Sequence, residues 1–221
     1  MGADVIGISG SPVPHSNTDR VLQAVLESTG LSTEFVKLSE YRYEACRACL
    51  GCVKTNVCVI QDDAQQLIGA FRDAKAFVLG AFTPYSSLDA RSKAFMERTY
   101  CLRHLQGLNR AKPGAAIITT ACEPGAPNLP PAAEVAQNQL AFWMMEEGMR
   151  NLGSLVVRGN VPCIRCGFGD ECELSGIRML HGETATVDSV GVRTFEEDPV
   201  LVARAQQFGR MIRAAVVGEQ P

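Results

Sequence analysis

The chain contains 221 residues, of which 46% are hydrophobic, and it carries a formal net charge of −3. This length is enough for one domain with a well-packed core, and no apolar stretch is long enough to predict a membrane span. The acidic balance and the lack of a basic run argue against a nucleic-acid partner, because phosphate backbones bind to positive surfaces. Nine cysteines without a secretion signal favour a reducing cytoplasm.

Short β-rich runs alternate with helical patterns along the chain. In chain order, we expect a strand at 5–9, a helix at 18–28, a strand at 34–37, a helix at 63–74, a strand at 76–80, a helix at 90–101, a strand at 115–119, a helix at 132–152, a strand at 155–157 and a helix at 199–217. This alternation predicts an α/β fold with a doubly wound parallel sheet. Five strands favour the flavodoxin-like order 2-1-3-4-5.

Two segments, residues 41–62 and 159–193, do not fit the repeating strand-helix unit. No linker divides the chain, so we expect a single domain over residues 1–221 in which these segments are insertions. Both follow parallel strands, and both are therefore expected near the carboxyl edge of the sheet, where such folds bind their ligands.

The first insertion carries four closely spaced cysteines, Cys46, Cys49, Cys52 and Cys58. A thiolate run with spacings of two, two and five residues can bind one cubic 4Fe-4S cluster, which indicates electron transfer. Zinc is the main alternative, although structural zinc normally uses two separated Cys-x2-Cys pairs. Structural or redox-active thiols without a metal are a third interpretation.

A polar loop follows the first strand and leads into a helix, over residues 7–18. Small and hydroxyl-bearing residues there allow backbone amides, hydroxyl groups and the helix N-terminus to bind a phosphate. The loop matches neither a P-loop nor the dinucleotide fingerprint, so the phosphate of FMN fits it better than FAD does. A plain strand-to-helix loop, with Ser16 or Asn17 as the N-cap, is the alternative.

Three stretches together resemble the iron-sulfur flavoproteins within the NADPH-dependent FMN reductase group of flavodoxin-like proteins. They are Gly10-Ser11-Pro12 with Ser16-Asn17-Thr18, the cysteine run followed by Gln61-Asp62-Asp63, and the loop and helix from Phe82 to Arg98. The resemblance implies FMN across the carboxyl edge with a 4Fe-4S cluster nearby. It nominates for the phosphate Ser9, Ser11, Ser16, Asn17 and Thr18. For the ring system it nominates Pro84, Tyr85, Ser86 and Ser87, with Ala121 and Cys122 from the loop after the fourth strand.

Two positions depart from the family pattern. Val13 stands where an arginine often follows Gly-Ser-Pro, which removes one contact for a phosphate or a nicotinamide. The loop after the fourth strand, residues 120–125, contains a cysteine and a proline where the family is usually glycine-rich. We expect the flavin site to survive both changes and nicotinamide binding to be affected.

The second insertion contains Cys163, Cys166 and Cys172. The fourth and fifth strands are neighbours in the expected order, so Cys122 would lie close enough to complete a four-thiolate metal site. His181 or His104 is an alternative fourth ligand. An iron-sulfur cluster is favoured over zinc because the flavin edge is close, and free thiols are the remaining interpretation. The ninth cysteine, Cys101, is expected to be a buried core thiol.

These patterns predict an FMN-dependent iron-sulfur oxidoreductase that passes electrons between a 4Fe-4S cluster and FMN and on to an acceptor. A one-electron donor such as a ferredoxin, a small-molecule acceptor and assembly as a homo-oligomer are expected. No catalytic acid or base is evident, since the three histidines are scattered. An NAD(P)H-dependent FMN reductase with structural metal sites, and a redox or metal sensor, are the alternatives.

Overall fold

The computed structural model describes residues 2–126 and 129–218. Five strands form one parallel sheet in the order β2-β1-β3-β4-β5, which confirms the prediction. Hydrophobic residues fill the central strands without alternation, as in sheets covered on both faces. The strands are β1 (Val5–Ser9), β2 (Thr33–Lys37), β3 (Ala76–Phe82), β4 (Pro113–Thr120) and β5 (Arg150–Arg158).

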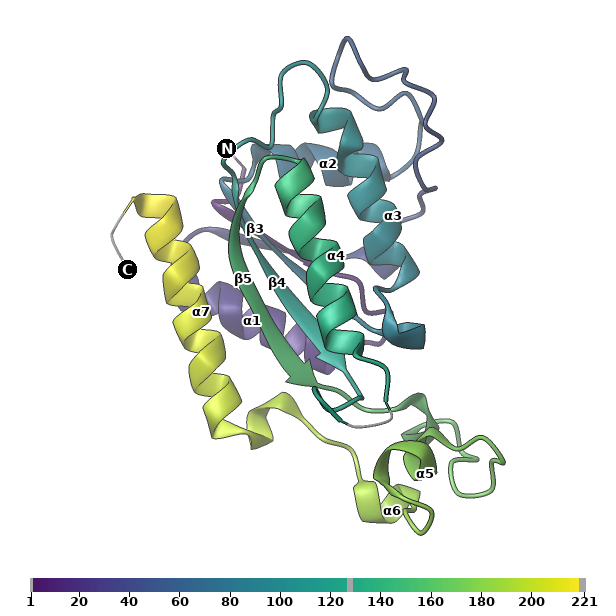
Figure 1. Cartoon of the computed structure of the whole chain (residues 1–221). Helices are drawn as coiled ribbons and strands as arrows, with labels where there is room; N and C mark the ends of the chain where they lie inside the picture. The colour runs from purple at the N-terminus through teal and green to yellow at the C-terminus, as the bar shows by residue number, and fades with distance from the viewer. Residues whose placement is uncertain (1, 127–128, 219–221) are drawn as a thin grey trace.

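Five main helices cover the two faces of this sheet (Figure 1). One face is covered by α1 (Asn17–Thr29) and α7 (Pro199–Val217), and the other by α2 (Ala64–Asp73), α3 (Ala90–Thr99) and α4 (Ala132–Glu146). Gly209 lets α7 approach α1 closely, since a Cβ atom there would lie 2.5 Å from the carbonyl oxygen of Val25. Among the helices of the described residues, none is both long and apolar enough to span a membrane.

The long helix is shorter, and the fifth strand longer, than the sequence pattern predicts. Helix α4 ends at Glu146 rather than at residue 152. Gly148 stops it, because this residue adopts a left-handed conformation with φ of 68°. The chain then turns at once into β5, whose first residue, Arg150, pairs with Pro113 of β4.

The two insertions lie at opposite ends of the sheet (Figure 1). The second insertion, which contains the short helices α5 (Gly176–His181) and α6 (Val187–Val190), projects from the carboxyl end as predicted. The first insertion leaves the carboxyl end of β2 but runs back along α3, and Asn56 in it bonds to the carbonyls of Cys101 and His104 just beyond that helix. The expectation that both insertions lie at the carboxyl edge was therefore wrong for residues 41–62.

At the amino end of the sheet, Lys112 holds the C-terminus of α2. Its ammonium group donates to the carbonyl oxygens of Phe71, Arg72 and Ala74 at 2.6, 2.8 and 2.6 Å. The side chain is 8% exposed, so its three donors are matched to three acceptors away from water.

We expect Lys112→Met to lower the free energy of unfolding by about 2–3 kcal/mol, because it leaves buried carbonyl groups without donors. Urea unfolding of the variant measures this loss. Lys75→Met is the matched control, since Lys75 forms an exposed pair with Asp4 and should cost less than about 1 kcal/mol. Equal small effects of both substitutions would contradict the assigned role of Lys112.

Candidate functional site

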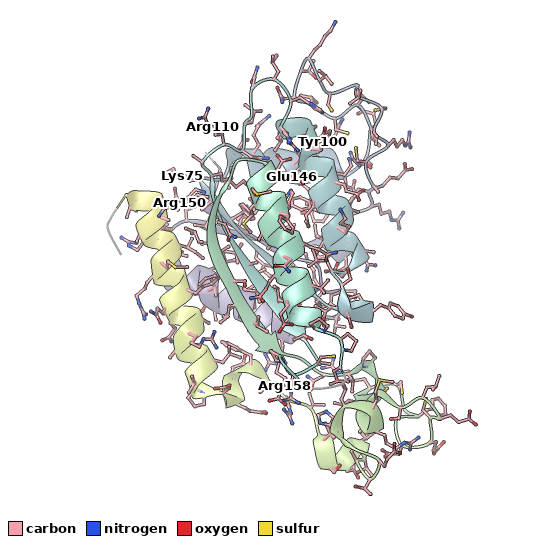
Figure 2. The ribbon with its side chains drawn as sticks, in the orientation of Figure 1. Lys75, Tyr100, Arg110, Glu146, Arg150 and Arg158 are labelled. Carbon is pink, nitrogen blue, oxygen red and sulfur yellow. The ribbon has the colours of Figure 1, made fainter. Side chains whose placement is uncertain are left out.

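A cavity of about 420 Å³ opens at the carboxyl end of the sheet. Arg158, the last residue of β5, lies at this end, whereas Tyr100 and Glu146 lie at the other end (Figure 2). Four segments line the cavity: Ser11–Val13 with Ser16–Thr18 after β1, Phe82–Pro84 after β3, Thr119 with Ala121 at the end of β4, and Gly159–Pro162 with Arg165 and Cys166 from the second insertion.

A buried carboxylate, Asp19, organises the loop that enters this cavity. Its side chain accepts hydrogen bonds from the Ser9 hydroxyl at 2.5 Å and from the Lys37 ammonium group at 2.5 Å. Lys37 also donates to the carbonyl oxygen of Val13 at 2.9 Å. Ser16 and Asp19 form a reciprocal capping box at the start of α1. The loop therefore has a fixed shape, and the amides of the first helical turn point toward the cavity.

Four of the five residues nominated for the phosphate line the cavity, namely Ser11, Ser16, Asn17 and Thr18. Ser9 does not line it, because this side chain is fully buried and its hydroxyl donates to Asp19. The Thr18 hydroxyl donates to that of Thr119 at 2.9 Å. Free hydroxyl capacity and helix amides therefore remain available to an anion in the first loop.

Asn17 has a structural role that the sequence did not reveal. Its amide nitrogen donates to the carbonyl of Arg193 at 3.0 Å, and its amide oxygen accepts from the backbone of Phe195 at 3.1 Å. Asn160 forms two more hydrogen bonds with the backbone of Arg193. The end of the second insertion is thus fastened to the start of α1.

The loops nominated for the ring system contribute fewer residues than expected. Pro84 and Ala121 line the cavity, whereas Tyr85, Ser86, Ser87 and Cys122 do not. The Tyr85 side chain is fully exposed, and the backbone at Tyr85 is left-handed with φ of 50°. Ser87 instead hydrogen-bonds with Gln139 of α4 at 3.2 Å.

The second insertion adds a wall to the cavity, and none of the residues of this wall was predicted to bind the flavin. Arg165 is the cation of this wall, and it lies on a segment that is distant in sequence from the phosphate loop. Val13 was the one feature of the sequence that could have indicated Arg165. A site that binds an anion and has valine where the family often has arginine needs a cation from another segment. The cavity thus combines helix amides, hydroxyls, one arginine and apolar surface, and this set suits FMN.

The first cysteine run lies beyond the C-terminus of α3, away from this cavity. Cys52 and Cys58 pack against the hydrophobic core, and Cys49 is exposed. Burial raises the pKa of the Cys52 thiol, and Cys58, Cys46 and Cys49 raise it further, so each of these three sulfurs is within electrostatic reach of Cys52.

Cys101 is 3% exposed, and its placement confirms the predicted core thiol. Burial raises the pKa of Cys101 to about 12, with smaller contributions from Cys58 and Cys52. The structure therefore places a ninth cysteine directly behind the first run, where the sequence showed only an isolated thiol.

A buried cation, Arg98, lies beside this run. Its guanidinium group forms a bidentate pair with Asp62, with N–O distances of 2.6 and 2.9 Å, and donates to the carbonyl of Glu44. Burial raises the pKa of Asp62, but the hydrogen bonds and charge of Arg98, together with the backbone amides of Glu44 and Ala64, hold this pKa below its usual value. Burial disfavours the charge of Arg98, yet Asp62 and the adjacent Cys58 raise its pKa overall.

The Arg98 Nε atom is buried and has no hydrogen-bond partner. A buried donor without a partner lowers the stability of the fold. Ionised thiols of the neighbouring cysteine run would supply the negative charge that this donor lacks. Four adjacent cysteines and a buried cation suit a 4Fe-4S cluster, whose thiolate shell carries negative charge. Within residues 2–126 and 129–218, no three His, Cys, Asp or Glu side chains converge in a geometry ready to bind a metal.

The second cysteine group lies at the cavity end of the molecule. Cys166 lines the cavity, whereas Cys163 and Cys172 are half-buried and do not line it. His181 lies in the same region, where burial, Arg158 and Arg193 lower its pKa. His104 packs against Tyr100 near the first run, so it lies too far away to serve the second group.

Comparisons with known proteins agree with this geometry. Residues 3–154 match the sequence profile of the NADPH-dependent FMN reductase family. An iron-sulfur flavoprotein of Methanosarcina thermophila is 28% identical over 87% of this chain and 90% of its own length. Another, from Methanocaldococcus jannaschii, is 32% identical over 55% of this chain and 64% of its own length.

Solved structures show the same fold at lower sequence identity. An NAD(P)H:quinone oxidoreductase from Methanothermobacter marburgensis superposes with a TM-score of 0.63 at 15% identity, covering 95% of this chain and 96% of its own. An azoreductase from Bacillus anthracis gives 0.61 at 15% identity, covering 93% and 98%. The profile match covers well over half of the sequence, and the chain therefore belongs to the NADPH-dependent FMN reductase family.

Proposed function

We propose that this protein is an iron-sulfur flavoprotein that transfers electrons between a 4Fe-4S cluster and FMN and delivers them to a small-molecule acceptor. The observation that carries this proposal is the pairing of the cavity at the α1 N-terminus with a four-cysteine run beside the buried Arg98 cation. FMN supplies the exchange between one-electron and two-electron chemistry when it is bound. The iron-sulfur flavoprotein relatives support the same assignment.

The residues of the chain have distinct tasks in this function. The first turn of α1, with Ser11, Ser16 and Thr18, binds the phosphate, and Arg165 balances its charge. Phe82, Pro84 and the second insertion exclude water from the ring side of the cavity. Cys46, Cys49, Cys52 and Cys58 bind the cluster, and Arg98 stabilises its negative charge.

The positions of the two sites favour electron transfer between copies of the chain. The cysteine run lies beyond the C-terminus of α3, whereas the residues that line the cavity lie at the carboxyl end of the sheet, from which the second insertion projects (Figure 1). We therefore propose a homo-oligomer in which the run of one copy faces the cavity of another. The exposure of Cys49 and of Leu50 beside it is consistent with a surface that a second copy covers.

We expect mass analysis of the extracted chromophore to identify FMN. FAD as the native occupant, or no flavin uptake, would end this proposal.

We further expect Arg165→Gln to weaken FMN binding about tenfold and to leave riboflavin binding unchanged, because only FMN carries the phosphate. Fluorescence titration measures both Kd values.

Arg103→Gln is the matched control for Arg165. It removes an exposed guanidinium that pairs with Glu146 at the opposite end of the molecule, so FMN affinity should not change. A loss of riboflavin affinity equal to the loss of FMN affinity in Arg165→Gln would assign this residue to the ring or to the cavity wall instead of the phosphate.

Cys52→Ala should remove the first cluster and leave FMN bound, since the flavin contacts come from other segments. Iron, sulfide and flavin analysis of anaerobically purified protein measures this, and flavin reduction by a one-electron donor should stop. Cys101→Ala is the control, because this buried neighbour of Cys52 is outside the ligand set and should retain the iron. Full donor-driven flavin reduction in Cys52→Ala would show that the cluster is not on the route.

The family match supports a second candidate, an NAD(P)H-dependent FMN reductase whose cysteine sites are structural. In that case NADPH should reduce the bound flavin in a single hydride transfer, equally well in the native protein and in Cys52→Ala. Anaerobic mixing with deuterated NADPH distinguishes the candidates. Our proposal expects no rapid hydride transfer, in keeping with Val13 at the position where the family often has arginine.

A further inference from the structure

The second insertion projects from the carboxyl end of the sheet (Figure 1), and it has very little hydrophobic core of its own. Among its residues, 159–193, Val161 and Ile177 are the buried apolar side chains. Segments with so small a core normally need a disulfide or a metal to hold one structure. The insertion nevertheless has to be ordered, because it forms one wall of the cavity.

Backbone amides already point at two of its cysteine sulfurs. The Gly176 amide donates to Sγ of Cys163 at 3.3 Å, and the Phe168 amide donates to Sγ of Cys166 at 3.4 Å. Gly167 between them is left-handed, with φ of 82°, which turns the chain back over Cys166. Amide donors stabilise the thiolate form, and metal-ligating sulfurs have such hydrogen bonds around them.

The third cysteine belongs to the same folded turn. The Cys172 amide donates to the carbonyl of Phe168 at 3.0 Å, and Arg178 donates to the carbonyl of Cys172. Gly169 lies so close to Cys163 that a Cβ atom there would be 2.6 Å from its carbonyl oxygen. The segments that carry all three sulfurs therefore pack on one another.

We propose that Cys163, Cys166 and Cys172 bind one thiophilic metal centre, iron or zinc, which fastens the insertion wall of the flavin cavity. In the described part of the chain the sulfurs do not yet converge, so the metal gathers them by side-chain rotation on this turn. Cys122 supplies the fourth ligand, because the Gly159 amide bonds to Thr120 at 2.7 Å and the two segments start side by side.

Metal binding then affects the flavin through Cys166 and Arg165, which line the cavity. Loss of the metal releases the turn that positions both residues, and the cavity wall loosens. This metal proposal depends on the proposed function in one respect only, which is that FMN is the ligand of the cavity. FMN affinity should therefore depend on the metal content of a site that does not itself contact the phosphate loop.

The test compares the native protein, the triple variant Cys163→Ser/Cys166→Ser/Cys172→Ser and the control Met179→Ala. Met179 is an exposed residue of α5 in the same insertion. Iron and zinc per chain are measured after anaerobic purification. The triple variant should lose about four irons if the site holds a cubic cluster, or one zinc or iron if it holds a single ion, and Met179→Ala should lose none.

The triple variant should also bind FMN at least tenfold more weakly by fluorescence titration. The single variant Cys166→Ser tests whether misfolding of the triple variant explains its metal loss. Its exposed side chain is replaced by one of similar size, so it should fold normally and still show the same metal loss. Equal iron and zinc in the native protein and both serine variants would overturn the proposal, as would metal loss without any change in FMN affinity. Absence of FMN from the native protein would defeat the proposed function, while the metal comparison would still decide this inference.

Discussion

The buried ion pair between Asp19 and Lys37 determines the shape of the functional end of the molecule. It joins the end of β2 to the start of α1, and through Ser9 and Val13 it fixes both ends of the intervening loop. Burying two charges is costly unless they are paired and hydrogen-bonded, and here the Ser9 hydroxyl and the Val13 carbonyl complete the hydrogen bonds of the pair. The phosphate loop is consequently held in place before any ligand arrives, and binding does not have to order it.

Most of the fold was predictable because its signals are local. Hydrophobic periodicity gave the strands and helices, and the flavodoxin-like order followed from their alternation. The end of α4 was missed because a left-handed Gly148 outweighs a run of good helix formers. The route of residues 41–62 was missed for a different reason, since it depends on contacts of Asn56 and Arg98 with segments far away in sequence.

The part of the candidate site that could be predicted from the sequence is the part formed by the single loop after β1. Ser11, Ser16 and Thr18 follow a strand directly, so their placement required only the fold. Ser9 is similar in sequence context, but the strand directs its side chain into the interior, toward Asp19. Arg165 and the wall around it arrive from an insertion whose path no periodicity describes, so they became visible only in three dimensions.

The two hydrogen bonds of the Asn17 side chain with the backbone at Arg193 and Phe195 have a consequence for biosynthesis. These bonds join the start of α1 to a segment that lies about 176 residues further along the chain. A ribosome must therefore reach Phe195 before these hydrogen bonds can form, although the central strands β1, β3 and β4 are complete by Thr120 and can pair earlier. The wall that the second insertion adds to the cavity can therefore be fixed only after the phosphate loop and the central strands have been synthesised.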